Sequence, residues 1–392
     1  MARGAGRDNR MTVSQTLAGK QIVVAVTGSI AAVEVVKLIH SLRRCGAVVQ
    51  PVMSDAASCI IQTDALTYAS GRETITRLSG WVEHITYCGE GGKADLLLIA
   101  PCTANTLSKI ACGIDDTPVT TFATTALGSR KPIVVVPAMH LSMFRHPAVT
   151  EHIAKLKQWG IDIVDPRIEE GKAKIADCED IVLHCERAIL GAALAGKKVI
   201  ITSGSCREPV DDIRVLTTRS SGQMGKALAL QAFRLGADVT VIHRDTFPCV
   251  NNVFAETAEE MRCAVHRCFS KGGADIYISA AAISDFAPKK IEGKIPSGKS
   301  VNILLEPLPK VLSEVIKNYN ALIIAFKLGR TPEKMAKTMI AQGVAMVLMN
   351  TPDSMGSDHG EYMLLTRTGE LPLNGTKDDI AIAIWNTVIQ HF

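Results

Sequence analysis

The chain has 392 residues, about twice the length of an ordinary domain, so we expect two domains. Apolar residues make up 47% of the chain and aromatic residues only 4%, a balance typical of parallel sheets covered by helices. The chain has 43 basic and 39 acidic residues, a net charge of +4 with no concentrated basic segment, so nothing indicates nucleic-acid binding.

The chain lacks the signs of secretion and of membrane insertion. Residues 1–19 are polar without the apolar centre of a secretory signal, and we interpret them as a disordered extension. The longest apolar runs, such as Leu96 to Pro101 and Ile133 to Met139, are far shorter than the roughly 20 residues that span a bilayer. The 11 cysteines are scattered without a C-x-x-C pair, which is typical of a reducing compartment. We therefore expect a cytoplasmic protein without membrane contact.

Two stretches of the chain share one layout. GKQIVVAVTGS begins at Gly19 and GKKVIITSGS at Gly196, and each is a β-branched run ending in a glycine-containing turn. A helix and a second strand follow in both, then a third strand introduced by Ala-Asp, in KADLLLIAP and GADIYISAA. Further strands are expected at KPIVVVPAM and ALIIAFKL. This spacing predicts two doubly wound, Rossmann-like parallel sheets, a flavodoxin-like domain over 20–190 and a second domain over 191–392.

The first predicted turn has the character of a phosphate site. Gly28 and Ser29 lie between a strand and the helix IAAVEVVKLI, so backbone N–H groups and a helix N-terminus come together there. The second strand ends in VQPVMS, without the acidic residue that an NAD-binding fold uses for the ribose hydroxyls. A mononucleotide is therefore favoured over NAD.

The segment IAPCTANTLSKIACGIDD follows the third strand of the first half. It places Thr103, Asn105 and Thr106 where parallel strands end, at the ligand-binding edge of the sheet. Together with TGSIAA, Ser54 and VVVPAMHLSM, this order resembles the homo-oligomeric flavin-containing cysteine decarboxylases, over Lys20 to about Val182.

This resemblance implies FMN as the cofactor and a set of residues around it. The residues that match positions of the FMN site are Gly28, Ser29, Ile30, Ser54, Ala100, Thr103, Asn105, Thr106 and Met139. His84 matches the catalytic histidine, which handles the substrate thiol proton while FMN takes a hydride from the cysteine moiety.

Two positions depart from the decarboxylase pattern. His140 stands in P-A-M-H where that family has P-x-M-N; a histidine can still donate to a substrate carboxylate, with a charge that depends on pH. The substrate-covering flap is shortened to PRIEEGKAKIADCED, and Cys178 lies several residues too late to match the family's flap cysteine. An incidental thiol is favoured over a catalytic one for Cys178.

The second half carries a different set of motifs. ITSGSCREPVDDIRVLTTRSSGQMGKALA, from Ile201 to Ala229, resembles the signature of phosphopantothenoylcysteine synthetase. AAAISDFAP with EGKIPSG, then AFKL and VLMNTPD, follow in the same order, and the resemblance continues to Phe392. The whole chain thus resembles the bifunctional coenzyme A biosynthesis proteins, in an archaeal-type variant.

The resemblance implies a nucleotide and substrate site in this half. Its matching residues are Gly204, Thr218, Ser220, Ser221, Gly222, Ala281, Asp285, Lys294, Phe326, Lys327 and Asn350. Lys294 and Lys327 are expected at the departing pyrophosphate, and Asp285 at the ribose or at a Mg²⁺ ion bound with CTP or ATP. Thr218 replaces the family's asparagine and Gln223 its lysine, which removes hydrogen-bonding capacity and charge.

The leading hypothesis is an enzyme that ligates cysteine to 4′-phosphopantothenate and decarboxylates the product to 4′-phosphopantetheine. One alternative retains only the flavin decarboxylase activity beside an impaired ligase domain. Another is a non-catalytic flavoprotein that regulates a partner. The resemblance implies a homo-oligomer, with trimeric flavin domains and dimeric ligase domains.

Overall fold

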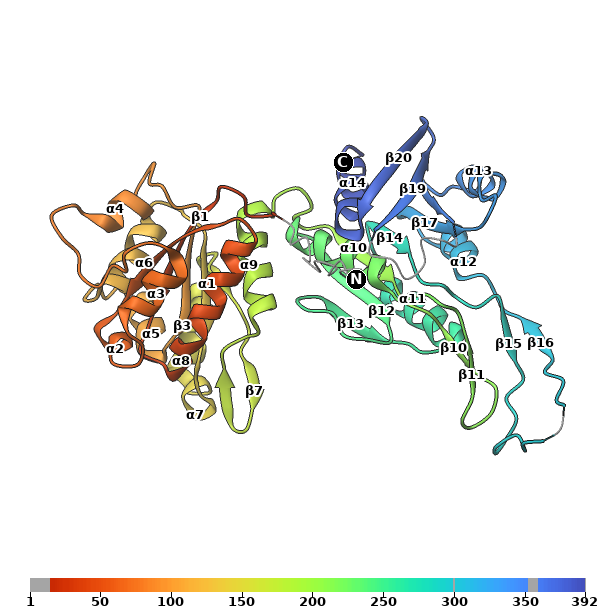
Figure 1. The fold of residues 1–392 in the computed structure, drawn as a ribbon, viewed down its shortest axis with the longest axis horizontal. Coiled ribbons are helices and arrows are strands. Elements are labelled where there is room, and N and C mark those ends of the chain that lie inside the picture. Colours follow the sequence, from red (N-terminus) through yellow and green to blue (C-terminus); the bar gives the residue numbers. More distant parts are fainter. Residues whose placement is uncertain (1–14, 299, 352–358, 392) are drawn as a thin grey trace, which may run out of the picture. The chain divides into compact units, whose positions relative to one another are not determined.

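The computed structural model describes residues 15–298, 300–351 and 359–391. The chain divides into two compact units, Met1–Ile189 and Leu190–Phe392 (Figure 1). No helix among the described residues is both long enough and apolar enough to cross a membrane.

Part of the segment 1–19, expected to be disordered, is described by the structure. Residues 1–14 lie outside the described residues, but residues 15–19 form a turn. Leu17 in this turn is fully buried, and its N–H donates to the carbonyl of Cys45 at 2.8 Å. The expectation of disorder is therefore wrong for residues 15–19, because an apolar anchor fixes them to the first unit.

Unit 1 is built on a five-stranded parallel sheet in the order β2-β1-β3-β4-β6. Its strands are β1 Gln21–Val26, β2 Val48–Met53, β3 Leu96–Cys102, β4 Ile133–Pro137 and β6 Asp162–Ile163. This is the flavodoxin-like order, in which the chain reverses direction across the sheet between β1 and β3, and ligands bind outside the carboxyl ends of the strands at that point.

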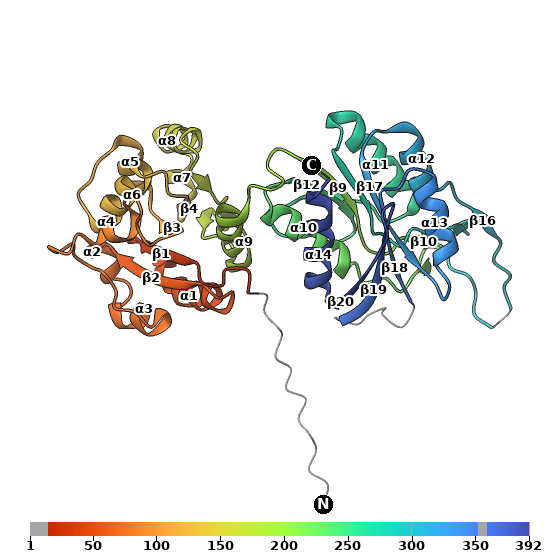
Figure 2. The same ribbon diagram turned by 90° about the horizontal axis from the view of Figure 1, so that it is seen from above.

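Helices cover both faces of this sheet (Figure 2). They are the 3₁₀ helix η1 Ile30–Glu34, α1 Val35–Arg44, α2 Asp55–Ser58, α3 Thr63–Ser70, α4 Glu83–Cys88, α5 Ala104–Cys112, α6 Pro118–Gly128, α7 Leu141–Phe144, α8 Pro147–Gln158 and α9 Cys178–Leu190. Successive side chains of β3 point to opposite faces, so Leu98 packs with the α1 and α9 side and Leu97 with the α5, α6 and α8 side. Both faces of β3 are buried, which explains its uninterrupted apolar run.

A small antiparallel sheet adjoins the carboxyl end of β4. Its strands are β5 Met139–His140, β7 Arg167–Glu169 and β8 Lys172–Lys174, in the order β5-β8-β7. β7 and β8 form a hairpin, and the register places His140 opposite Lys172. The shortened flap of the sequence is thus a basic hairpin attached to the ligand edge of unit 1.

Unit 2 contains an eight-stranded sheet in the order β13-β12-β9-β14-β17-β18-β19-β20. Its strands are β9 Lys198–Thr202, β12 Asp238–His243, β13 Asn251–Phe254, β14 Ile276–Ser279, β17 Leu322–Leu328, β18 Met346–Asn350, β19 His359–Thr366 and β20 Glu370–Thr376. The first six in chain order are parallel in the 3-2-1-4-5-6 arrangement of Rossmann folds, with the reversal between β9 and β14. The expected fold class is confirmed for both units. β19 and β20 add an antiparallel pair that the sequence reading did not include.

Helices flank the second sheet (Figure 2). They are α10 Gln223–Arg234, α11 Ala258–Gly272, α12 Val311–Asn318, α13 Glu333–Ala341 and α14 Lys377–Ile389. On one face, Tyr277 of β14 packs with Phe269 of α11 and Val315 of α12. α10 and α14 pack against each other, and the buried Trp385 donates from Nε1 to the carbonyl of Leu228 at 2.9 Å.

Two short hairpins extend from the strand ends of unit 2. They are formed by β10 Arg207–Pro209 with β11 Val215–Thr217 and by β15 Phe286–Pro288 with β16 Leu305–Pro307. Figure 1 shows both hairpins on the same side of unit 2. Their loops are joined by hydrogen bonds, including Ile291 N–H to the carbonyl of Val210 at 3.0 Å.

Candidate functional sites

Unit 1 has a cavity of about 540 Å³ at the point where its sheet order reverses. Such a volume lies within the roughly 300–1,000 Å³ of small-molecule sites. The walls come from the ends of β1, β3 and β4 and from the β7–β8 hairpin. The lining residues are Gly28, Ser29, Ile30, Ala31, Val33, Glu34, Thr103, Ala104, Ala138, Met139, His140, Met143, Arg167, Lys172, Ala173, Lys174 and Ile175.

The Gly28 turn fits its place closely. A Cβ at Gly28 would lie 2.6 Å from Cβ of Ala56, so no larger residue fits without moving α2. Ser29 follows in an extended conformation and its hydroxyl does not cap η1. Ile30 exposes 77% of its surface at the cavity. The turn thus presents backbone and one apolar side chain to a ligand.

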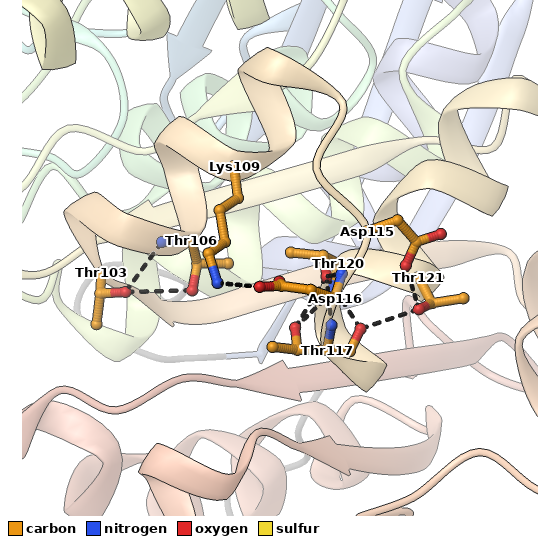
Figure 3. A network of polar contacts seen from close by, with 8 residues as sticks. All are labelled: Thr103, Thr106, Lys109, Asp115, Asp116, Thr117, Thr120 and Thr121. Carbon is orange, nitrogen blue, oxygen red and sulfur yellow. Dashed lines mark hydrogen bonds and ion pairs between the residues drawn. The ribbon is translucent and has the colours of Figure 1, made fainter.

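Thr103 and Thr106 hold the start of α5. The Thr103 hydroxyl accepts from Thr106 N–H and donates to the Thr106 hydroxyl, both at 3.2 Å (Figure 3). Thr106 is buried and does not line the cavity, whereas Asn105 between them is exposed in the first turn of α5. The threonine hydroxyls therefore position the helix.

The same network continues to α6 (Figure 3). Lys109 pairs with Asp116 at 2.6 Å, and Thr121 donates to Asp115. Thr117 caps α6 through a reciprocal bond with Thr120. The polar residues after β3 thus fix the two helices that follow the cavity edge.

The cavity wall is rich in cations. Arg167, Lys172 and Lys174 come from the flap hairpin, and Glu34 is the single carboxylate among the described residues of the wall. Lys174 pairs with Glu170 at 2.9 Å, while Lys172 forms no ion pair with a described residue. Because His140 lies opposite Lys172, the side chains that can bind an anion lie together on the side of the cavity formed by the flap hairpin.

Several residues expected at the flavin do not line this cavity. The Ser54 hydroxyl caps α2 by accepting from Ala57 N–H at 3.3 Å, and Ala100 is fully buried in β3. His84 lies in α4, outside the cavity wall, and its Nδ1 is buried without a hydrogen-bond partner. Of the residues expected at the flavin, those of the Gly28 turn with Thr103 and Met139 line this cavity, and His84 does not.

No cysteine lines this cavity among the described residues. Cys178 is half-buried at the start of α9, in a neighbouring pocket of about 240 Å³ that also contains Lys37 and Asp177. Cys102 in β3 is fully buried, and burial raises the pKa of its thiol to about 12. A buried thiol of that pKa is inert.

Unit 2 has a second cavity, of about 170 Å³, at its own strand-order reversal. The walls come from the start of α10, the ends of β14, β17 and β18, and residues of β19 and α14. The lining residues are Arg219, Ser220, Ser221, Gly222, Gln223, Met224, Gly225, Ala280, Ala281, Ala282, Phe326, Leu328, Asn350, Tyr362 and Lys377.

The start of α10 lies directly on the end of β9. Gly222 precedes the helix with a φ of 74°, in the left-handed region, and no side chain caps the helix. A Cβ at Gly225 would lie 2.1 Å from Oγ of Ser203, which excludes any side chain there. The Ser203 hydroxyl donates to the Gly222 carbonyl at 3.1 Å. The backbone N–H groups that begin α10 therefore face the cavity.

Lys377 supplies a charge beside Gln223. Its Nζ donates to Oε1 of Gln223 at 3.0 Å, and both residues line the cavity. The sequence departure at Gln223 thus does not leave this part of the site without a cation.

Five residues expected at the nucleotide lie outside the cavity wall: Gly204, Thr218, Asp285, Lys294 and Lys327. Gly204 lies next to Gly222 of the cavity wall: its Cα is 3.2 Å from the position that a Cβ of Gly222 would occupy. Asp285 and Lys294 are exposed on the β15 side. No group of three or more His, Cys, Asp and Glu in the described part of the chain could hold a metal ion.

Comparison with known proteins adds to this geometry. Residues 10–190 match a family model described as Flavoprotein, and residues 194–392 match one described as DNA/pantothenate metabolism flavoprotein C-terminal domain. A coenzyme A biosynthesis bifunctional protein CoaBC from Thermococcus kodakarensis is 42% identical over 391 residues, covering 96% of each chain. The chain belongs to this CoaBC family. The family expected from the sequence is confirmed.

One further relative and two solved structures are also similar to this chain. CoaBC from Methanocaldococcus jannaschii is 37% identical over 387 residues, covering 94% of this chain and 93% of the relative. A crystal structure of the C-terminal domain of CoaBC is 28% identical with a TM-score of 0.44, covering 51% of this chain and 98% of the other. The structure of the FMN-dependent cysteine decarboxylase SpaF is 28% identical with a TM-score of 0.39, covering 44% and 98%.

The sequence reading missed parts of both cavities. Arg219, Met224 and Gly225 adjoin the predicted S-S-G turn, so extending that motif would have found them. Lys172 lies in the segment expected to form the substrate-covering flap, but no role was expected for the residue itself. Lys377 carries no local signal, because it reaches the cavity only through long-range packing.

Proposed function

We propose that the chain catalyses two consecutive steps of coenzyme A biosynthesis. Unit 2 ligates cysteine to 4′-phosphopantothenate at the expense of a nucleoside triphosphate, and unit 1 decarboxylates the product to 4′-phosphopantetheine. The observation that carries the proposal is a ligand cavity at the strand-order reversal of each unit, in a chain that matches a CoaBC protein over nearly its whole length.

The residues of the unit 1 cavity fit FMN. Gly28 leaves a space beside Ala56 that a Cβ would fill, so the backbone of the turn can approach a phosphate. Met139, Met143 and Ile30 offer apolar surface to a flat ring system. When bound, FMN supplies an acceptor for two electrons from the cysteine moiety and returns them after carbon dioxide has left.

The chain's own residues handle the protons and anions of this step. His140 and Lys172, side by side at the flap, donate to the carboxylate or phosphate of the substrate. His84 accepts the thiol proton. Because His84 does not line the cavity of its own chain, we propose that a second copy brings it there, in a trimer of flavin units.

The surface around His84 supports this assembly. Trp81 exposes 84% of its surface, and Val82 and Ile85 about half of theirs. Exposed apolar residues gathered on one short segment are typical of an interface. A neighbouring copy that covers α4 would bury them and bring His84 beside a flavin.

In unit 2 we propose an acyl nucleotide route with CTP or ATP and Mg²⁺. The carboxylate of 4′-phosphopantothenate attacks the α-phosphorus, and pyrophosphate leaves. The amine of cysteine then attacks the acyl carbon, losing a proton, and the nucleoside monophosphate leaves. Ser220, Ser221 and the backbone N–H groups at the start of α10 donate to phosphate oxygens. The described side chains alone form no metal site, so the nucleotide phosphates supply the oxygen ligands of the Mg²⁺ ion.

We also propose that the enzyme works in the cytoplasm and that its ligase units pair as dimers. The described residues form no disulfide, which is typical of a protein from a reducing compartment.

The half-reactions test the proposed function separately. Purified protein should release pyrophosphate with 4′-phosphopantothenate, cysteine and one of the two nucleotides, and should release carbon dioxide from supplied phosphopantothenoylcysteine. Loss of the first reaction alone would leave a single-activity decarboxylase. Loss of both would leave a flavoprotein without catalysis.

A further inference from the structure

A cysteine, a histidine and a serine meet in unit 1 where α5 and α8 pack together. The two helices lie side by side against the first sheet (Figure 1 and Figure 2). Ser108 and Cys112 stand four positions apart on α5, so both project from one side of the helix. His152 of α8 reaches both of them: its Nδ1 is 3.0 Å from the Ser108 hydroxyl, and its Nε2 is 3.7 Å from Sγ of Cys112. None of the three residues lines a cavity described above.

The two nitrogens of His152 can divide their roles so that the thiol is activated. A neutral imidazole carries one N–H donor and one acceptor, and a serine hydroxyl can accept. When Nδ1–H donates to Ser108, the lone pair of Nε2 faces the Cys112 thiol and can take its proton. The carbonyl end of α5 favours the resulting imidazolium but opposes a thiolate at Cys112. The thiolate therefore depends on the imidazolium beside it.

The other exposed thiols among the described residues have partners that keep the thiol protonated. Sγ of Cys59 donates to the carbonyl of Asp55 at 3.6 Å. Sγ of Cys263 donates to Oε1 of Glu259 at 3.3 Å, and this hydrogen bond raises the pKa of the Cys263 thiol. Cys112 is exposed as well, but its partner is a base. Of these exposed thiols, Cys112 is therefore the one placed to act as a nucleophile.

We propose that Cys112 is a modification site, at which its thiolate exchanges with small disulfides such as cystine. Exchange needs a thiolate and access to it rather than a binding pocket, which fits an exposed thiol outside the cavities. The site stays a thiol in a reducing compartment and is modified when small disulfides accumulate.

The exchange needs no further reactant. The Cys112 thiolate attacks one sulfur of the disulfide, and a new S–S bond joins that sulfur to Sγ. The S–S bond of the small disulfide breaks, and its second sulfur leaves as a thiolate that takes the proton from the His152 imidazolium. Cys112 is thereby oxidised to a mixed disulfide, and one half of the small disulfide is reduced to a thiol.

The test is the rate at which each thiol of the full-length protein exchanges with cystine at about pH 7. The reaction is stopped with acid and each cysteine is followed by mass spectrometry of its peptide. Wild type is compared with His152→Gln and Ser108→Ala, and Cys112→Ser confirms the modified position. The matched control is His40→Gln, which removes a half-buried imidazole of α1 that packs against Tyr68.

We expect Cys112 to form the mixed disulfide about 10-fold or more faster than the other two exposed thiols, because its larger thiolate fraction outweighs the lower nucleophilicity that comes with it. His152→Gln should remove this advantage, Ser108→Ala should reduce it in part, and His40→Gln should leave it unchanged. At about pH 10 thiols ionise without a neighbouring base, so wild type and His152→Gln should then react at similar rates.

Three results would overturn the inference. Exchange at Cys112 that is no faster than at the other exposed thiols would show that the thiol is not activated. An unchanged rate in His152→Gln would show that the imidazole does not take the proton. A loss in His152→Gln that persists at about pH 10 would mean that the substitution changes access to the thiol and not its ionisation.

Discussion

The carboxylate of Asp211 accepts a hydrogen bond from the backbone N–H of Ile295 at 3.1 Å, directly after Lys294. The same carboxylate accepts from the N–H groups of Ile213 at 2.8 Å and Arg214 at 2.6 Å, and from the Arg214 guanidinium at 2.5 Å. The segment that carries Lys294 is therefore tied to the loop between β10 and β11.

Asp211→Asn should slow ligation by loosening the Lys294 segment. The asparagine amide keeps one acceptor oxygen, but its NH₂ group is a donor and would face N–H groups that are donors too. The β10–β11 loop and the Lys294 segment should therefore separate. Misplacement of a catalytic cation by about 1 Å costs on the order of 10²-fold in rate. The measurement is pyrophosphate release, with decarboxylation of supplied phosphopantothenoylcysteine as an internal control that should not change.

Lys294→Gln is the matched comparison. It should slow acyl nucleotide formation by roughly 10²- to 10³-fold and leave the melting temperature unchanged, because Lys294 is exposed. Asp211→Asn should lower both the rate and the melting temperature. If Asp211→Asn has the wild-type melting temperature and ligates at the wild-type rate, Asp211 does not position Lys294.

The stabilising effect of Asp211 should depend on pH in one direction. Burial alone would raise the pKa of this carboxyl, but the three N–H groups and the guanidinium outweigh it and hold the pKa well below its usual range. A carboxyl whose pKa is lower in the folded chain than in the unfolded chain stabilises the fold. Its full contribution is present when the pH is above the unfolded-state pKa of about 3.9, and it is lost as the pH falls through the folded-state pKa. The difference in melting temperature between wild type and Asp211→Asn should therefore be constant from neutral pH to about pH 5 and shrink in stronger acid.

Gly225→Ala should destabilise the start of α10 by about 1–3 kcal/mol, since the new Cβ would lie 2.1 Å from Oγ of Ser203. Nucleotide binding should weaken as well, because the N–H groups of this turn would be displaced. Gly128→Ala is the matched control: it lies exposed in α6 with nothing within 4 Å of the new Cβ. That variant should gain about 0.4–1 kcal/mol in unfolding free energy. Equal effects of the two substitutions would contradict the close approach at Gly225.

His84→Asn should reduce decarboxylation by on the order of 10²-fold or more while flavin stays bound and ligation continues. The reason is that His84 handles the substrate proton in the proposed mechanism, and that it does not line the cavity of its own chain. Flavin content is read from the absorption spectrum, and the released chromophore is identified by mass as FMN. Wild-type decarboxylation by this variant would return His84 to a structural role.

Mixed assemblies test whether His84 acts on a neighbouring copy. Gly28→Ala should lose flavin, because its Cβ would meet Ala56, but it keeps His84. Co-expression of Gly28→Ala with His84→Asn, followed by purification through two different tags, should restore part of the decarboxylation. Each variant alone should be inactive. No recovery in an assembly shown to contain both chains would contradict the shared site.

The parts of this protein that local chemistry determines were predictable from the sequence. Buried β-branched runs and glycine turns located β1, β3 and β9, and the turns at Gly28 and Gly222 were found at the cavities. Lys377 was not predictable, because it reaches Gln223 only after α14 has packed on α10. His84 was chosen from a motif, which reports residue identity but not whether the residue serves its own chain or the next.

The central claim is that one chain carries out both steps, and a single reaction tests it. Purified protein is given 4′-phosphopantothenate, cysteine and CTP or ATP, and pyrophosphate and carbon dioxide are measured over time. The account predicts that both appear in equal final amounts, with pyrophosphate leading, and that omitting the nucleotide abolishes both. Carbon dioxide from supplied phosphopantothenoylcysteine without any pyrophosphate from the complete mixture would contradict it.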